Sequence, residues 1–82
     1  MAKCWTYKYS EYTIKVFNKN LDGSELYVNG ELRDQKKGIS LSDHLTVTLK
    51  SGEIVSATLE GTFSINCSLC INGKPLEPVE VK

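Results

Sequence analysis

The sequence has no excess of either charge and no long hydrophobic run. Ten Lys and Arg residues balance ten Asp and Glu residues, so the formal net charge of the 82-residue chain is zero. Nucleic-acid binding relies on neutralised phosphates, and the chain has no basic stripe that would supply the positive charge. No apolar stretch reaches the length of a signal peptide or a transmembrane span, and no basic amphipathic helix is visible. We therefore expect neither a nucleic-acid partner nor a membrane partner.

Metal-binding residues are also scarce, with one histidine and three cysteines in the chain. An odd number of cysteines is typical of free thiols in a reducing compartment, so we expect a cytoplasmic protein. Cys67 and Cys70 have the spacing of half a zinc site, which Cys4 and His44 could complete. However, residues three apart on an extended strand project to opposite faces. We therefore predict no metal ligands, and keep a structural zinc module as an alternative.

The tripeptide Ser42-Asp43-His44 contains the residue types of a hydrolytic triad. Triad members come together from separate elements, and three adjacent residues cannot form that hydrogen-bonded relay. We interpret the tripeptide as a turn before a strand. No second histidine and no paired carboxylates are discernible, so we predict a protein that is not an enzyme and needs no cofactor.

What the sequence does contain is a set of tight-turn signals: Asn29-Gly30, Ser51-Gly52 and Asn72-Gly73. Each lies between short runs rich in β-branched, aromatic or leucine residues. A type I′ turn needs a positive φ at both central residues, which Asn-Gly adopts at little steric cost. We therefore predict three antiparallel hairpins, which pair residues 25–28 with 31–34, 45–50 with 53–59, and 63–71 with 74–81.

Apolar and polar residues alternate along most of the chain, which is the period of a strand with one buried face. About eight short strands separated by turn signals are typical of a small sandwich or barrel. We predict one all-β domain over residues 1–82, a small antiparallel β-sandwich joined by hairpins, and leave open closure into a barrel. Pro75 and Pro78 place the last segment at a sheet edge, because proline has no N–H for a central ladder. The apolar faces of the later strands are Leu26 and Val28; Leu45, Val47 and Leu49; Val55, Ala57 and Leu59; and Phe63, Ile65, Cys67, Leu69 and Ile71.

Three aromatic residues, Trp5, Tyr7 and Tyr9, share one face of the opening strand and are candidates for a binding surface. Rings at this spacing could stack on a carbohydrate or another flat ligand. The alternative is that they form one wall of the core. We favour the core, because a domain this small needs its large side chains inside.

Tyr27 is predicted to differ from these residues in its orientation. Its neighbours Leu26 and Val28 occupy the core face, so the Tyr27 ring should point outward. An outward tyrosine beside a tight turn is either a cross-strand packing partner or an interface anchor. Tyr27 is therefore our first candidate for an interaction residue.

The order of these landmarks resembles a domain of the Fas apoptotic inhibitory molecule family. The landmarks are Trp5 in the first strand, Ile14 and Val16 in the second, Gly23 in a polar loop, Leu26-Tyr27-Val28-Asn29-Gly30-Glu31 and Leu69-Cys70-Ile71-Asn72-Gly73-Lys74. The resemblance implies a compact antiparallel sandwich without cofactor or catalytic residues, which acts through protein contacts. The chain has the length of one such domain, and residues 36–44 have no counterpart in the family's pattern. A small bacterial relative of the same fold is the alternative.

These observations lead to one functional prediction and two alternatives. We predict a non-enzymatic protein-interaction or assembly module, which binds a protein partner or self-associates through an edge strand. The first alternative is a sandwich that binds a small, carbohydrate-type ligand on its aromatic face. The second alternative is the structural zinc module.

Overall fold

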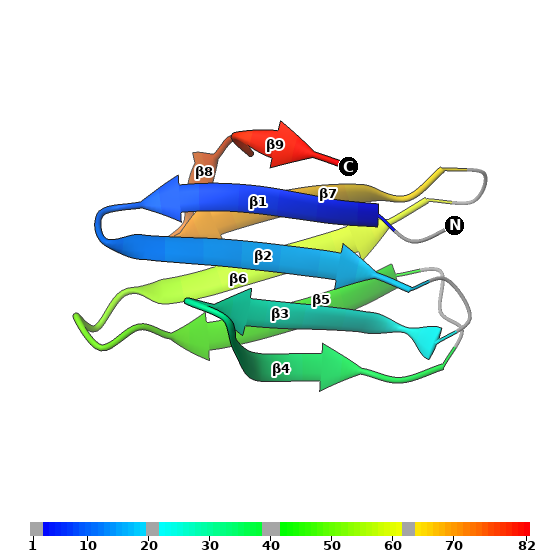
Figure 1. Cartoon of the computed structure of the whole chain (residues 1–82), viewed down its shortest axis with the longest axis horizontal. Helices are drawn as coiled ribbons and strands as arrows, with labels where there is room; N and C mark the ends of the chain where they lie inside the picture. The colour runs from blue at the N-terminus through cyan, green and yellow to red at the C-terminus, as the bar shows by residue number, and fades with distance from the viewer. Residues whose placement is uncertain (1–2, 20–21, 39–41, 62–63) are drawn as a thin grey trace.

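The fold consists of two antiparallel β-sheets packed face to face (Figure 1). A computed structural model describes residues 3–19, 22–38, 42–61 and 64–82. Its strands are β1 (Lys3–Tyr9), β2 (Tyr12–Asn18), β3 (Ser24–Val28), β4 (Glu31–Lys36), β5 (Ser42–Thr48), β6 (Ile54–Glu60), β7 (Asn66–Ile71), β8 (Lys74–Leu76) and β9 (Glu80–Val81). One sheet has the order β4-β3-β2-β1-β9 and the other has the order β5-β6-β7-β8. The predicted all-β sandwich is confirmed, and its two sheets stay open rather than closing into a barrel.

The turn chemistry explains two of the three predicted hairpins directly. In both Asn29-Gly30 and Asn72-Gly73, φ is 51° at the asparagine and 81° at the glycine, and a type I′ turn requires such positive values at both residues. At Ser51-Gly52 only the glycine has a positive φ, and the N–H of Gly52 donates to the carbonyl of Leu49 at 2.9 Å. This loop is therefore one residue longer than predicted: the two segments pair, as β5 with β6, but Lys50 lies in the loop instead of the strand.

The third hairpin is shorter than predicted. Only β8 pairs with β7, whereas β9 crosses to the other sheet and pairs with β1. Pro78 lies between them and has no N–H to continue the ladder with β7. The N–H of the next residue, Val79, donates to the carbonyl of Thr6 at 2.7 Å and so begins the new pairing. Both segments lie at sheet edges, as the prolines predicted, and Phe63 lies outside the described residues.

One core lies between the sheets and is formed by the alternating inward-facing residues. Its buried apolar side chains are Trp5, Tyr7, Tyr12, Ile14, Val16, Leu26, Val28, Leu45, Val47, Leu49, Val55, Ala57, Leu59, Leu69 and Ile71. Tyr9, Ile65 and Cys67 are partly buried against it. The apolar faces predicted from the alternation are therefore the core faces, since each successive side chain on a strand points to the opposite side.

A small polar network also connects the two sheets. The Ser24 hydroxyl on β3 donates to Oδ2 of Asp43 on β5 at 2.8 Å, and Asn18 Nδ2 donates to the same hydroxyl oxygen at 3.3 Å. Asp43 thus lies inside a strand, and the prediction of a turn at residues 42–44 is wrong. Strand β5 begins before Leu45, at Ser42, although the apolar alternation starts only at Leu45. Asp43 can occupy an inward position of this strand because it accepts the hydrogen bond from Ser24 of the other sheet.

The two halves of the chain have equivalent architecture. In each half four strands form a meander, and the third strand ends in an Asn-Gly turn. The pair of Lys15 with Tyr27 in one sheet occupies the same place relative to its turn as the pair of Ser56 with Cys70 in the other. The outer faces of the two sheets can therefore be compared position by position.

Candidate functional site

The outward side of the five-stranded sheet carries the candidate site. Strand alternation places Lys15 and Phe17 of β2 on this side, because Ile14 and Val16 point into the core. On β3, Glu25 is opposite Phe17, and Tyr27 is opposite Lys15. We call these residues, with Lys19 just beyond the end of β2, the aromatic face.

Two rings form the centre of the aromatic face. Phe17 and Tyr27 are diagonal neighbours on adjacent strands, and their ring centroids are 5.4 Å apart with planes at 78°. This edge-to-face geometry is one that aromatic pairs prefer. Both side chains are half-buried, so part of each ring remains open to a partner.

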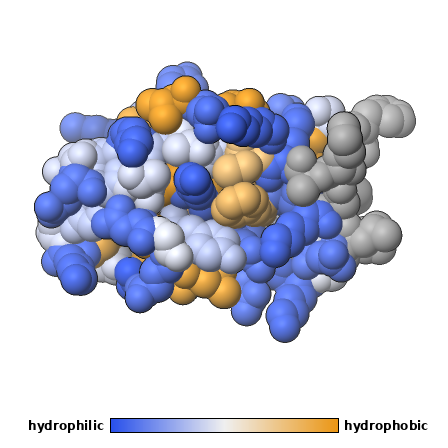
Figure 2. Space-filling view, in the orientation of Figure 1, coloured by the Kyte–Doolittle hydropathy of each residue, from blue (hydrophilic) through white to orange (hydrophobic). Residues whose placement is uncertain are grey.

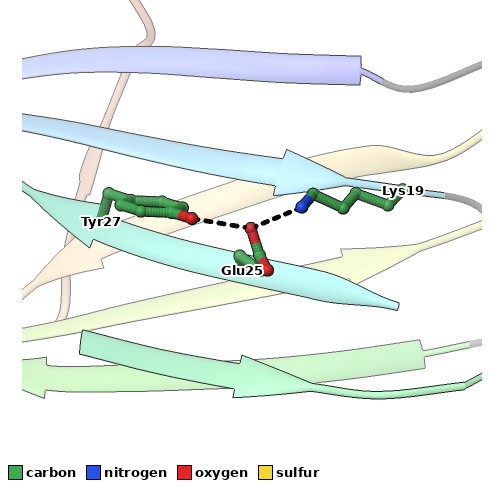
Figure 3. Close-up of polar contacts among 3 residues, drawn as sticks. All are labelled: Lys19, Glu25 and Tyr27. Atoms are coloured by element: carbon green, nitrogen blue, oxygen red, sulfur yellow. Dashed lines mark hydrogen bonds and ion pairs between the residues drawn. The ribbon is translucent and has the colours of Figure 1, made fainter. Parts of the chain in front are cut away.

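The Tyr27 hydroxyl is held in place by a carboxylate. It donates to Oε1 of Glu25 at 3.0 Å, and Lys19 Nζ lies 3.0 Å from the same oxygen (Figure 3). The Lys19 bond is the main reason why the pKa of Glu25 lies below its usual value, although partial burial opposes it. The Glu25 bond in turn raises the pKa of Lys19 and of Tyr27. At neutral pH the face thus holds an ion pair and a neutral, oriented phenol.

The surface is slightly hollowed at this place. A shallow depression of about 310 Å³ is lined by Lys15, Phe17, Lys19, Glu25, Tyr27 and Gly30. Figure 2 views this side of the molecule and shows a small apolar area near the middle, bordered by hydrophilic side chains. An apolar centre inside a polar rim is the usual anatomy of a protein-binding surface.

The structure separates the sequence-predicted candidates into two groups. Trp5 and Tyr7 are 4% and 0% exposed, so their rings belong to the core and offer no face to a ligand. Tyr9 is half-buried at the end of the same row, and its hydroxyl donates to Oε2 of Glu53 at 3.0 Å. Tyr27 lies on the outer side of its strand, as predicted.

Sequence reasoning missed the partners of Tyr27. The signal for Phe17 was present, because it directly follows the inward-facing Val16 and must therefore point outward. Its contact with Tyr27 depends on the register between β2 and β3, which the polar loop between them sets. The roles of Lys19 and Glu25 depend on the same register.

Cys67, Cys70 and His44 lie apart from this face, whereas Cys4 of β1 is opposite Phe17 on the outward side of the same sheet. Cys67 points inward and accepts a hydrogen bond from the Tyr7 hydroxyl at 3.3 Å, whereas Cys70 is on the opposite side of the same strand. His44 makes its ring contacts with Thr58 and Ser56, at 3.1 and 3.4 Å. Among the described residues, no three His, Cys, Asp or Glu side chains form a group that could hold a metal ion.

The outer side of the four-stranded sheet has the same geometry but different chemistry. The positions equivalent to Phe17 and Tyr27 are Thr58 and Cys70. The row around them carries hydroxyl groups and His44 rather than aromatic rings. The aromatic pair is therefore a feature of one outer face and not a requirement of the meander.

The comparisons with known proteins add no relative to this description. No protein-family model, curated protein or solved structure matches the chain. The resemblance to the Fas apoptotic inhibitory molecule family therefore stays a prediction. In the part of the chain that the structure describes, no helix could cross a membrane.

Proposed function

We propose that this chain is a non-enzymatic protein-interaction module that binds its partner through the aromatic face. The observation that carries the proposal is the Phe17–Tyr27 pair, which leaves half-exposed apolar ring surface between the charged side chains of Lys15, Lys19 and Glu25. Interface hot spots are enriched in tyrosine and lie in packed positions surrounded by polar contacts. Because Glu25 already orients the Tyr27 ring, binding would cost little side-chain entropy.

The sheet edges favour contact through a face rather than through an added strand. At the edge of the five-stranded sheet, β4 contains a bulge at Arg33, where its register with β3 shifts, and carries several charged residues. At the edge of the other sheet, the N–H of Thr46 donates to Oδ2 of Asp34 at 2.9 Å. Pro75 lies in β8, and β9 has only 2 residues. Bulges, charges, proline and short strands all oppose edge-to-edge pairing.

The chemistry of the aromatic face also favours binding over catalysis. Its carboxylate, Glu25, is engaged by Lys19 and Tyr27, and these bonds hold its pKa below the usual value. A general base for neutral pH needs the opposite shift, toward a higher pKa. All three cysteines are free thiols, which supports a reducing, cytoplasmic setting for the proposed interaction.

The test is a capture experiment with variants at equivalent positions of the two sheets. Immobilised wild-type protein, Tyr27→Ala and Cys70→Ala are exposed to lysate of the host, and captured proteins are quantified by mass spectrometry. We expect Tyr27→Ala to lose specific partners by about tenfold or more, because truncation removes the ring that anchors them. Cys70→Ala, at the matching position of the other sheet, should retain them.

Folding must be checked in the same preparations, because Tyr27 packs on Phe17. We expect Tyr27→Ala to lower the melting temperature by only a few degrees, since its ring is outside the core. The proposal fails if every captured protein is retained by Tyr27→Ala, or if Cys70→Ala loses the same proteins.

A further inference from the structure

The aromatic face has an excess of positive charge, although the chain as a whole is neutral. Three lysines, Lys8, Lys15 and Lys19, lie on this side of the sheet, and Glu25 is the carboxylate between β2 and β4. At the other edge, Glu80 of β9 is also on this side and pairs with Lys82, and Asp22 lies near Lys19. Lys19 is already paired with Glu25, and Lys8 Nζ donates to the Thr13 hydroxyl at 2.7 Å. Lys15 is exposed and forms no ion pair with any residue that the structure describes.

The carboxylates that balance these lysines are used elsewhere. Asp34 accepts a backbone hydrogen bond from β5, and Asp43 accepts the hydroxyl of Ser24 between the sheets. Glu53 accepts hydrogen bonds from the hydroxyls of Ser51 and Tyr9. These three anions serve the fold, and the positive charge that remains on the aromatic face is centred on Lys15.

The spacing of these groups follows the backbone of β2. Lys15, Phe17 and Lys19 are two residues apart in succession, so a cation lies on each side of the half-buried Phe17 ring along the chain direction. Residues two apart on an extended chain are about 6.8 Å apart. An extended peptide laid along this row would present matching groups at the same two-residue interval.

We propose that the partner presents an extended acidic segment with the pattern acidic, any residue, apolar, any residue, acidic. This inference rests on the proposed function. The apolar side chain would pack on the Phe17–Tyr27 pair, and one carboxylate would pair with the free ammonium of Lys15. The second carboxylate would approach Lys19, whose ammonium has three donors and uses one of them on Glu25.

The same charges argue against a second copy of this chain as the occupant. The aromatic face holds two lysines and one carboxylate, so two such faces brought together would both be net positive, and like charges across an interface cost binding energy. An acidic partner gains attraction from the same groups and is steered toward them during encounter.

The test uses a fluorescently labelled synthetic peptide with alternating Glu and Thr and one central Leu. Its two controls have Lys in place of every Glu, or Ala in place of the Leu. Fluorescence polarisation should show binding of the acidic peptide only, with affinity that falls steeply when the salt concentration rises from about 0.05 M to about 0.5 M. The inference is overturned if the acidic peptide does not bind, or if the Lys peptide binds as well.

Charge-reversal variants identify the surface that binds the peptide. Lys15→Glu should weaken binding by about tenfold or more, because it replaces attraction by repulsion. Lys74→Glu makes the same charge change on an exposed residue of β8 in the other sheet and should leave the affinity unchanged. Equal effects of both variants would show non-specific attraction and overturn the assignment to Lys15.

The peptide assay and the capture experiment fail in distinguishable ways. If Tyr27→Ala loses cellular partners but the acidic peptide does not bind, the aromatic face is a binding surface for another class of partner. If sedimentation shows a dimer that Tyr27→Ala dissociates, the occupant is a second copy and the acidic segment is wrong. If Tyr27→Ala changes neither the set of captured proteins nor the affinity for the peptide, the proposed function itself is wrong.

Discussion

Gly23 and Gly52 have almost the same backbone conformation but very different surroundings. Their φ values are +97° and +99°, a region that side chains rarely adopt. A Cβ on Gly52 would have no atom within 4 Å. A Cβ on Gly23 would overlap the carbonyl oxygen of Lys36 and lie 2.9 Å from both the Lys36 carbonyl carbon and the Cα of Lys37. The two Gly→Ala variants therefore share the conformational strain and differ in the steric clash.

The size of each effect follows from these two contributions. The strain of a positive φ costs about 1–2 kcal/mol in either variant. In Gly23→Ala, backbone atoms of Lys36 must also move, which disturbs its pairing with Ser24 at the end of the β3–β4 ladder. One or two lost hydrogen bonds add about 1–2 kcal/mol. We expect Gly52→Ala to lose about 1–2 kcal/mol and Gly23→Ala about 2–4 kcal/mol, from a total of about 4–12 kcal/mol for a domain of this size.

Urea unfolding followed by tryptophan fluorescence measures both losses. Trp5 is 4% exposed, so its emission should shift to the red when the protein unfolds. Far-UV circular dichroism gives an independent probe, and coincident transitions would justify a two-state analysis. Equal free-energy losses in the two variants would refute the reasoning, because the overlap with Lys36 would then have no cost.

Two further predictions concern ionisable groups outside the aromatic face. Burial raises the pKa of the Cys67 thiol, although the hydrogen bond from Tyr7 opposes the rise. Cys67 should therefore react with a thiol reagent at pH 8 more slowly than Cys4 or Cys70. Mass spectrometric mapping of the labelled cysteines that finds one common rate would contradict this prediction. Hydrogen bonds from the Ser51 hydroxyl first, then from its own backbone and Tyr9, lower the pKa of Glu53 below its ordinary value of 4.5. Because the folded-state pKa is the lower one, ionised Glu53 stabilises the fold above about pH 4.5, and this contribution is lost as the pH falls through the folded-state pKa. Melting temperatures should therefore fall less steeply below pH 4.5 in Glu53→Gln than in the wild type, and parallel curves would count against the assignment.

The parts of the fold that the sequence predicted are those determined by local geometry. Asn-Gly turns define where strands reverse, and the two-residue alternation determines which side chains are buried. The predicted pairing of residues 74–81 with 63–71 was wrong for the residues of β9, because no local sequence feature distinguishes a strand that stays in its sheet from one that crosses to the other sheet. Pro78 marks the place where the ladder with β7 stops, but the new partner, β1, is about seventy residues away in the sequence.

The candidate site was predicted only in part for a similar reason. The outward orientation of Tyr27 follows from its neighbours Leu26 and Val28 within one strand. Its contacts with Phe17 and Lys19 cross to another strand, and they depend on a register that a loop sets. Strand alternation thus predicts which side a residue occupies, whereas the composition of a surface requires the pairing of strands.

The two meanders share one architecture but carry different outer faces. Folding requires each meander to bury one face, and both do so with the same turn and the same inward alternation. The outer faces are not needed for that purpose, and they differ: Lys15 and Tyr27 on one sheet correspond to Ser56 and Cys70 on the other. Because the fold accepts small polar residues at these positions, packing of the core does not explain why one face carries an aromatic pair between lysines. The binding role that we propose would account for that difference, and variants at the matched positions separate this role from stability.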